Sequence, residues 1–287
     1  MAHNTAQVEP NARSLSAPPG PAASFRWVDA LGRAVVRFLR AAKAQIAFAI
    51  ISLSIAFGKS GVASRVVRPL IRSQIHRAGW RLLPMTTFLA FALGLVIIGQ
   101  TIALLTRVGI QSYVGVVMVS IVVRELGPLA VALLVLARVG TAYVIELGTA
   151  RALGEVEALE ALGIDPIHYL VVPRVVGLAL SVFSLTVYFI LAALASGYVF
   201  AFLQDVPLLP GEYFRQIAGA LTAEDFVLLG LKTLGFGGVI ATVTCFQGLA
   251  QPMRLEDVAG ATTRAVVQSV VGCVLLDAAV IGVYLVK

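Results

Sequence analysis

Charged residues are scarce in this sequence. Asp, Glu, Lys and Arg make up 13% of the 287 residues, and hydrophobic residues make up 59%. Ordinary soluble domains carry roughly 25% charged residues. Several apolar runs exceed the ~20 residues that a helix needs to cross a hydrocarbon core of about 30 Å. The composition therefore excludes an ordinary soluble protein and predicts an all-α membrane protein.

Residues and motifs that commonly build catalytic or metal sites are also few. The two cysteines, Cys245 and Cys273, lie in apolar runs, where cysteine behaves as a small hydrophobic residue, so we expect no disulfide framework and no metal cluster. No HExxH or GxSxG pattern occurs. Gly58-Lys59-Ser60 imitates the end of a P-loop, but the motif needs a glycine where Leu53 stands. We expect no catalytic residue and no cofactor, so any energy source must be a partner.

Basic residues are concentrated before the first long apolar run. Twelve of the 22 Lys and Arg residues lie between Arg13 and Arg81. Short cytoplasmic segments are enriched in this way, which predicts a cytoplasmic N-terminus. Residues 1–24 contain four prolines and predict a disordered cytoplasmic tail, with no cleaved signal peptide.

Residues 25–81 predict a basic, interfacial region. Apolar residues from Trp27 to Leu39 recur at helical spacing, with arginines between them. Such an amphipathic helix is expected to lie flat on the cytoplasmic membrane surface, although a helix packed on a soluble domain would show the same pattern. The run from Gln45 to Phe57 is too short to span comfortably and predicts an interfacial or re-entrant segment. The arginines expected at the membrane surface are Arg33, Arg37 and Arg40.

Residues 82–287 predict a domain of five membrane spans. We expect them at about residues 82–105, 108–137, 175–203, 226–250 and 265–286. An odd number of spans places the C-terminus on the outer side. Seventeen Lys and Arg residues then lie on the cytoplasmic side and three outside, an asymmetry that supports this orientation.

The connection between the second and third spans predicts a short cytoplasmic helix at about residues 150–162. Thr149 can cap its start, and Arg151 and Glu155 are spaced for an i,i+4 ion pair. Gly163 suits the C-terminal cap, and Pro166 prevents continuation. From these residues alone, a solvated connector and a docking helix for a partner are equally good interpretations.

Four charged residues fall within the expected spans, where a charge usually faces a protein interior or a wet cavity. Arg124 and Glu125 lie in the second span, Lys232 in the fourth and Asp277 in the fifth. Neighbours in sequence point about 100° apart around a helix, so Arg124 and Glu125 are expected to find partners on other helices. Arg124 could bind an anionic headgroup or form a structural ion pair, and Lys232 leaves a similar choice. Asp277, alone in an apolar segment, predicts a structural role.

Six ordered motifs then give the chain a family resemblance. They are Arg124-Glu-Leu-Gly-Pro128, Ala137-Arg-Val-Gly140, Glu146-Leu-Gly148, Glu157-Ala-Leu-Glu-Ala-Leu-Gly-Ile-Asp-Pro166, Val172-Pro-Arg174 and Gly260-Ala-Thr-Thr-Arg-Ala-Val-Val267. With them, the sequence from about Arg33 to the C-terminus closely resembles the MlaE/YrbE permease family.

The resemblance implies the permease subunit of an ABC transporter in the bacterial inner membrane, with its C-terminus in the periplasm. Such a transporter moves phospholipid or a related lipid to or from a periplasmic MCE-domain protein and helps to maintain outer-membrane lipid asymmetry. The implied partners are a second copy of the chain, a cytoplasmic ATPase that binds the ATP, membrane lipid and, in some systems, a small STAS-like subunit, but no nucleic acid.

The same resemblance assigns roles to residues of this chain. Arg124, Glu125 and Lys232 would lie along the lipid path, and the acidic cytoplasmic helix would be the coupling helix that fits into the ATPase. The residues expected to contact the ATPase are Glu155, Glu157, Leu159, Glu160, Leu162 and Asp165.

A self-sufficient, ion-coupled transporter is the main alternative from another class. It would use Glu125, Lys232 and Asp277 as a proton relay, but such proteins often contain internal repeats, and five spans show no convincing repeat. An intramembrane enzyme has little support because the three histidines fall in the tail or near the membrane faces. A membrane scaffold would explain several buried charges less readily.

Overall fold

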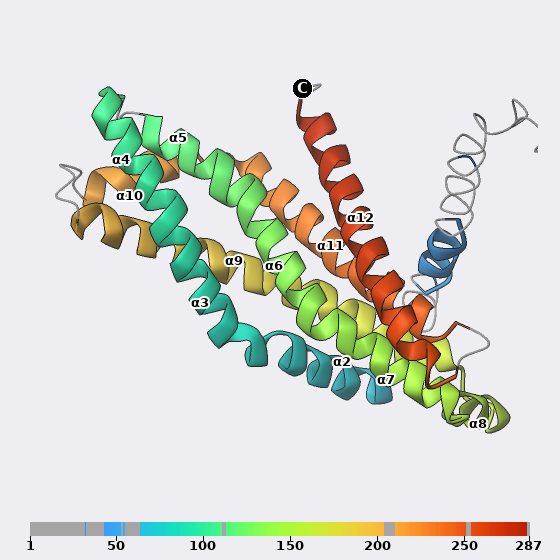
Figure 1. Ribbon diagram of the computed structural model, residues 1–287. Coiled ribbons are helices and arrows are strands. Elements are labelled where there is room, and N and C mark those ends of the chain that lie inside the picture. Colours follow the sequence, from blue (N-terminus) through green and yellow to red (C-terminus); the bar gives the residue numbers. More distant parts are fainter. Residues whose placement is uncertain are drawn as a thin grey trace, which may run out of the picture. The chain divides into compact units, whose positions relative to one another are not determined.

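The computed structural model describes residues 32, 43–52, 54, 64–110, 113–203, 210–250 and 254–285. Over these residues all regular elements are helices (Figure 1). Five of them are long and apolar enough to cross a membrane, which confirms the predicted all-α, five-span architecture. The five helices are Arg68–Val108, Val114–Ala152, Ile167–Phe200, Ala223–Gly248 and Asp257–Gly282.

The chain divides into two units, Met1–Ala44 and Gln45–Lys287, and all five spans belong to the second. The predicted tail and the surface arginines Arg33, Arg37 and Arg40 lie outside the described residues. A short apolar helix, Lys43–Ser52, overlaps the run from Gln45 to Phe57 that was predicted to be interfacial or re-entrant.

The first long helix begins well before residue 82, where the first span was predicted to start. Its elements in chain order are α2 (Ser64–Ala78), η2 (Trp80–Leu82), α3 (Leu83–Leu93), η3 (Gly94–Ile98) and α4 (Gly99–Val108). Gly79 does not interrupt the helical hydrogen bonding, because its N–H donates to the carbonyl of Ile75 at 2.7 Å. Arg68 and Arg72 are exposed on α2, and because of these and other charges the long apolar run begins only after Arg81.

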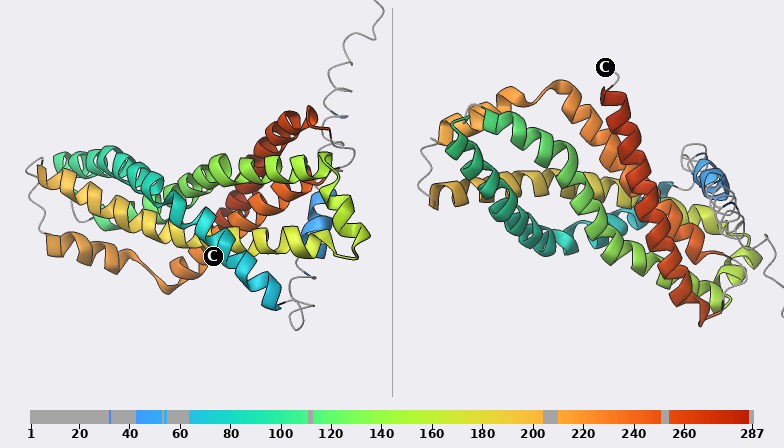
Figure 2. Two further views of the ribbon diagram at one scale, coloured as in Figure 1. Left: turned by 90° about the horizontal axis from the view of Figure 1, so that it is seen from below. Right: turned by 45° about the horizontal axis from the view of Figure 1, so that its top comes forward.

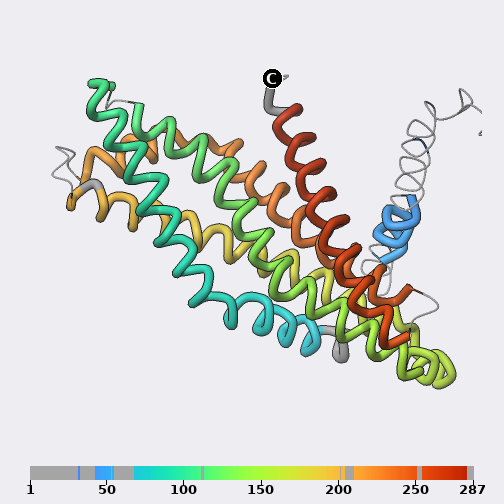
Figure 3. Tube along the Cα trace, viewed as in Figure 1, coloured from blue at the N-terminus to red at the C-terminus, as the bar shows by residue number. Residues whose placement is uncertain are grey.

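The second long helix also extends beyond its predicted limit at residue 137. It comprises α5 (Val114–Met118), η5 (Val119–Leu126), α6 (Gly127–Val135), η6 (Leu136–Gly140) and α7 (Thr141–Ala152), in which η5 and η6 are π-helical. The tube in Figure 3 shows this course as one connected rod. Pro128 does not break it. Proline supplies no N–H to the carbonyl of Arg124, four residues earlier, and Nζ of Lys232 donates to that carbonyl at 2.7 Å.

The predicted cytoplasmic helix at residues 150–162 is shorter than expected. The structure has α8 at Glu155–Ala161, separated from α7 by Gly154, whose φ is +77°. Such a left-handed conformation favours glycine and ends the preceding helix. The prediction that Thr149 caps this helix was therefore wrong, since Thr149 lies inside α7.

The C-terminal half supplies the remaining three spans and one short helix. Its elements are η7 (Ile167–Val171), α9 (Val172–Leu203), α10 (Pro210–Ala220), α11 (Ala223–Gly248) and α12 (Asp257–Leu285). At the start of α11, Thr222 and Asp225 form a reciprocal capping box. Burial raises the pKa of Tyr213 on α10, and its neutral hydroxyl donates to the carbonyl of Leu194 at 3.2 Å.

Helices α9 and α11 form the centre of the packing. Helix α9 contacts α2, α3, α6 and α11, whereas α11 also contacts α7 and α12; Figure 2 shows these neighbours from two further sides. Gly237 permits the approach of α9 and α11, because a Cβ there would lie 2.5 Å from the Cα of Ala179. Small residues allow such close contact between membrane helices.

Different helices form the two ends of this unit. Helices α4, α5 and α10 gather at one end, while α7 and α8 lie at the other (Figure 1). The motif residues near the α8 end therefore lie far from α10, and the charged residues of the second span lie between the two ends.

Candidate functional site

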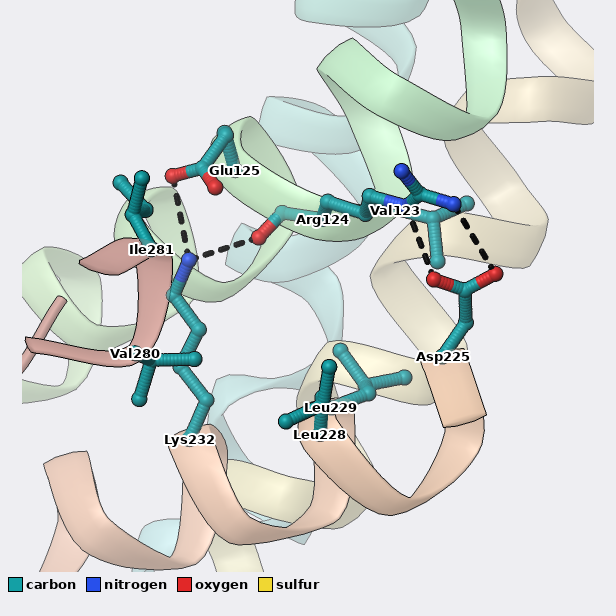
Figure 4. A pocket seen from close by; sticks show the side chains of 9 residues that line it. All are labelled: Val123, Arg124, Glu125, Asp225, Leu228, Leu229, Lys232, Val280 and Ile281. Carbon is teal, nitrogen blue, oxygen red and sulfur yellow. Dashed lines mark hydrogen bonds and ion pairs between the residues drawn. The ribbon is translucent and has the colours of Figure 1, made fainter. Parts of the chain in front are cut away.

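A bidentate ion pair joins the second span to the start of α11. Arg124, in η5, approaches Asp225 with Nε 2.8 Å from Oδ1, and its Nη2 donates to Oδ2 at 3.2 Å (Figure 4). Thr222 holds the carboxylate in place, because its backbone N–H and its hydroxyl both donate to Oδ2 at 2.9 Å. The Asp225 side chain is only 2% exposed, so this ion pair belongs to the packing contact between the second span and α11.

Lys232 forms a second charged group on the next turns of α11. Its Nζ donates to the backbone carbonyl of Arg124 at 2.7 Å and to Oε2 of Glu125 at 3.1 Å, and it also pairs with the carboxylate of Asp277 on α12. The ammonium group therefore has two hydrogen-bond acceptors and a second carboxylate as an ion-pair partner. Lys232 is buried at 3% exposure, so one side chain ties three spans together.

A cavity of about 100 Å³ opens beside both groups. The side chain of Glu125 is 40% exposed and that of Arg124 is 27% exposed, while aliphatic side chains form the rest of the wall (Figure 4). The lining residues are Val123, Arg124, Glu125, Asp225, Leu228, Leu229, Lys232, Val280 and Ile281. The cavity thus has a charged edge and an apolar wall, as an amphipathic ligand requires.

The structure brings together all three residues predicted along the lipid path, Arg124, Glu125 and Lys232, and it adds Asp277 to the group. Arg124 and Glu125 find their partners on other helices, as predicted from the angle of about 100° between neighbouring side chains around a helix. Their role toward lipid stays a prediction, as does the structural role of Asp277.

Asp225 is the residue of this site that the sequence analysis missed. The expected fourth span began at residue 226, one position too late to include it. A usable signal was present, because Thr222-Ala-Glu-Asp225 has the spacing of a capping box before an apolar run. That signal predicts a helix start at Thr222, but it does not predict Arg124 as the partner.

The predicted ion pair between Arg151 and Glu155 is not formed. Gly154 ends the helix between them, so the i,i+4 geometry of a single helix does not apply. Arg151 is buried and instead places Nε 3.0 Å from Oε1 of Glu157 and Nη1 3.8 Å from Oε1 of Glu160. These contacts fasten α8 to the end of α7.

The outward surface of this tip is both acidic and apolar. Leu162 is 75% exposed and Leu153 is 61% exposed, and Glu155 is exposed while Leu159 is half-buried. Gly163, with φ +75°, ends α8 by donating to the carbonyl of Glu160 at 3.0 Å, which confirms the predicted C-terminal cap.

The remaining residue predicted to contact the ATPase, Asp165, has a local role. Its Oδ1 accepts the N–H of Ile167 at 2.9 Å at the start of η7. Of the six predicted contact residues, Glu155 and Leu162 are therefore the two that combine exposure with no ion pair or side-chain hydrogen bond in the described part of the chain.

A third charged group ties α2, α7 and α9 near the same end. Glu146 accepts from Nη1 of Arg77 at 2.5 Å and from Nη2 of Arg174 at 3.2 Å. The guanidinium of Arg174 also lies 5.4 Å from the centre of the Tyr143 ring, whose hydroxyl donates to Gln74 at 2.9 Å. Glu146 and Arg174 occur in two of the motifs that carry the family resemblance, and their side chains contact each other.

Comparison with known proteins gives one consistent family. The family model described as Permease MlaE matches residues 71–282, well over half of the chain. A probable ABC transporter permease protein of Rickettsia bellii is 30% identical over 239 residues, which cover 81% of this chain and 89% of the relative. A probable ABC transporter permease protein of Synechocystis is 30% identical over 71% of this chain and 78% of the relative.

A plant protein is also similar. The chloroplastic protein TRIGALACTOSYLDIACYLGLYCEROL 1 of Arabidopsis thaliana is 29% identical over 231 residues, or 75% of this chain. The match covers 64% of the plant protein's own length.

Proposed function

The chain belongs to the MlaE permease family, and on that premise we propose that it carries phospholipid or a related lipid as the membrane subunit of an ABC transporter. The observation that carries this proposal is the amphipathic cavity between the second, fourth and fifth spans. A lipid offers a polar headgroup and an apolar body, and this cavity offers a charged edge and an aliphatic wall. The plant relative, which is named after a galactolipid, supports the same class of cargo.

The proposed energy source is a separate cytoplasmic ATPase. The relatives are named as ABC transporter permeases, and such permeases work with ATPase subunits. We propose that the ATPase docks on α8 and the adjoining loops, where Leu153, Glu155 and Leu162 are exposed. A groove on the ATPase would cover the two leucines and place a basic side chain opposite Glu155.

The remaining assembly belongs to the same proposal. Two copies of the chain would enclose the lipid path, and an MCE-domain protein on the periplasmic side would exchange lipid with it. A STAS-like subunit would bind on the cytoplasmic side if the system contains one. We propose a bacterial inner-membrane location with a cytoplasmic N-terminus and a periplasmic C-terminus, supported by the excess of basic residues in the segments assigned to the cytoplasm.

Transport would follow from movement of the permease between two states. An ATPase can only shift the permease between states that it binds with different affinity. Because α7 continues without a break into the segment that carries Arg124 and Glu125, displacement at α8 would reach the cavity through the body of one helix.

The coupling surface can be tested by charge reversal at Glu155. Glu155→Lys, combined with Leu162→Ala, should reduce lipid-stimulated ATP hydrolysis and ATPase copurification by about tenfold or more, which corresponds to about 1.4 kcal/mol. Glu212→Lys is the matched control, because Glu212 is an exposed glutamate on α10 at the other end of the unit. Reversal at Glu157 or Glu160 would be less informative, since both hold Arg151.

Unchanged ATPase binding and lipid transport in the double variant would exclude α8 as the docking site.

Lipid carriage by the chain is tested separately. The complex purified from native membranes is expected to contain bound lipid, an ATPase and an MCE-domain protein by mass spectrometry, and a preparation that contains none of them would refute the proposal.

The alternative proton-coupled transporter has one observation in its favour. Glu125, Lys232 and Asp277 form a continuous chain of ionisable groups. Liposomes that contain the chain alone distinguish the two functions, because a proton gradient would drive transport only in the alternative. A strict requirement for the ATPase and ATP would exclude it.

A further inference from the structure

The charges around the cavity do not cancel. Arg124 and Lys232 contribute two positive charges, and Glu125, Asp225 and Asp277 contribute three negative charges. Among the residues that line the cavity there is no further lysine or arginine. With all five groups ionised the group carries a net charge of −1. An uncompensated charge at membrane depth is unfavourable, so the site is suited to a positive ligand group.

The excess negative charge falls on one part of the group. Asp225 faces Arg124 through two contacts, which balances that pair. Glu125 and Asp277 share the single ammonium of Lys232. Of these two carboxylates, Asp277 is 11% exposed and Glu125 is 40% exposed, so Glu125 is the one that a ligand in the cavity can reach.

The positive groups are correspondingly poor receptors for an additional anion. Lys232 already donates to Glu125 and to the carbonyl of Arg124 and forms an ion pair with Asp277, and Arg124 forms an ion pair with Asp225. A phosphate placed here would also lie near the Glu125 carboxylate, and like charges at short range repel. This balance of charge argues against selection of an anionic headgroup by Arg124 alone.

We propose that the cavity receives the ammonium group of an amine-containing lipid headgroup, and that the Glu125 carboxylate accepts its hydrogen bonds. This inference rests on the proposed function of lipid transport and specifies the headgroup chemistry. Hydrogen bonds between an ammonium and a carboxylate are charge-assisted and therefore strong. Val280, Ile281 and Leu228, which line the same cavity, would contact the carbon atoms next to the headgroup.

The experiment compares two lipids that differ only in the amine. The chain, purified with its partners in detergent, is incubated with equal amounts of phosphatidylethanolamine and phosphatidylethanol that have identical acyl chains. Bound lipid is then quantified by mass spectrometry after washing. The wild-type protein should retain the amine lipid over the amine-free lipid by about tenfold, a ratio that corresponds to about 1.4 kcal/mol.

Two variants remove the excess charge at different positions. Glu125→Gln removes the charged acceptor, and Asp277→Asn leaves Lys232 to neutralise Glu125 alone. Each variant should lower the ratio of retained amine lipid to amine-free lipid from about tenfold to about twofold or less. Glu212→Gln is the matched control, because Glu212 is an exposed glutamate on α10 that does not line the cavity. Size-exclusion profiles identify any variant that fails to fold, and the other variant then decides.

The outcomes separate this inference from the proposed function. Equal retention of both lipids by the wild-type protein would mean that a proton, and not a headgroup, compensates the charge, and it would overturn the inference while leaving lipid carriage intact. An unchanged preference in a folded Glu125→Gln or Asp277→Asn variant would also overturn it. No retained lipid in any preparation would instead contradict the proposed function.

Discussion

Replacement of Lys232 by methionine is the most direct test of how the charged group holds the spans together. Methionine has a similar length but no charge, so Lys232→Met removes three contacts, to the carbonyl of Arg124 and to the carboxylates of Glu125 and Asp277. Removal of one partner from a buried ion pair typically destabilises a protein by about 3–5 kcal/mol. We expect a loss in this range, because Lys232 is 3% exposed.

The free energy of unfolding can be measured by titrating the detergent-solubilised protein with a denaturing detergent. Leu231→Met is the matched control, because it introduces the same side chain at the adjacent, exposed position of α11 and should change stability by less than about 0.5 kcal/mol. The double variant Lys232→Met/Asp277→Leu should recover most of the loss, since replacing a buried pair by apolar residues is often neutral.

Two results would refute this reasoning. A Lys232→Met protein within about 1 kcal/mol of the wild type would show that the ammonium group does not stabilise the packing. Equal stability losses in Lys232→Met and in the double variant would show that Asp277 is not energetically coupled to Lys232.

Three further predictions concern the helix contacts. Gly237→Ala should lower the free energy of unfolding, because the added Cβ would meet the backbone of α9. Gly238→Ala, whose added Cβ would have no atom within 4 Å, should leave the free energy of unfolding unchanged or raise it by up to about 1 kcal/mol. The reverse order would contradict the close approach of α9 and α11 at Gly237. Arg151→Met should release α8 from α7 and increase amide hydrogen exchange in residues 155–161, while unchanged exchange would show that its two glutamate contacts do not hold α8. Tyr143→Phe removes the hydrogen bond to Gln74 and should destabilise the protein by about 1–2 kcal/mol, and no loss in a thermal melt would show that this bond makes no net contribution.

The number of spans was predictable because each apolar run is long and its neighbours are polar. The limits of the spans were less predictable, since α2 and α7 are helical but contain charged residues, which interrupt the apolar runs. Arg68 and Arg72 face outward on α2, and Arg151 extends from α7 to the acidic residues of α8. The extent of these helices is therefore not set by the local hydropathy, and α7 ends just before Gly154 with its positive φ.

The positions of the intramembrane charges were predictable, but their pairing was not. Sequence spacing correctly indicated that Arg124 and Glu125 do not pair with each other. It could not indicate that Arg124 meets Asp225, because these residues are 101 positions apart and come together only when η5 packs against α11. The capping box that orients Asp225 is a local signal, whereas its ion pair is a property of the fold.

The geometry of the second span also limits how α8 and the cavity can communicate. From Glu125 to Arg151 the chain is helical throughout, and 26 residues of helix reach roughly 35–40 Å. A rod of this kind transmits a tilt better than it transmits a local change. Glu125 lies in the π-helical segment η5, and π-helical turns within longer helices occur frequently at functional sites. A tilt imposed at α8 would therefore change the distance between Glu125 and Lys232, which belongs to a different helix. Movement of the ATPase would then alter the charge compensation that determines whether a headgroup stays in the cavity.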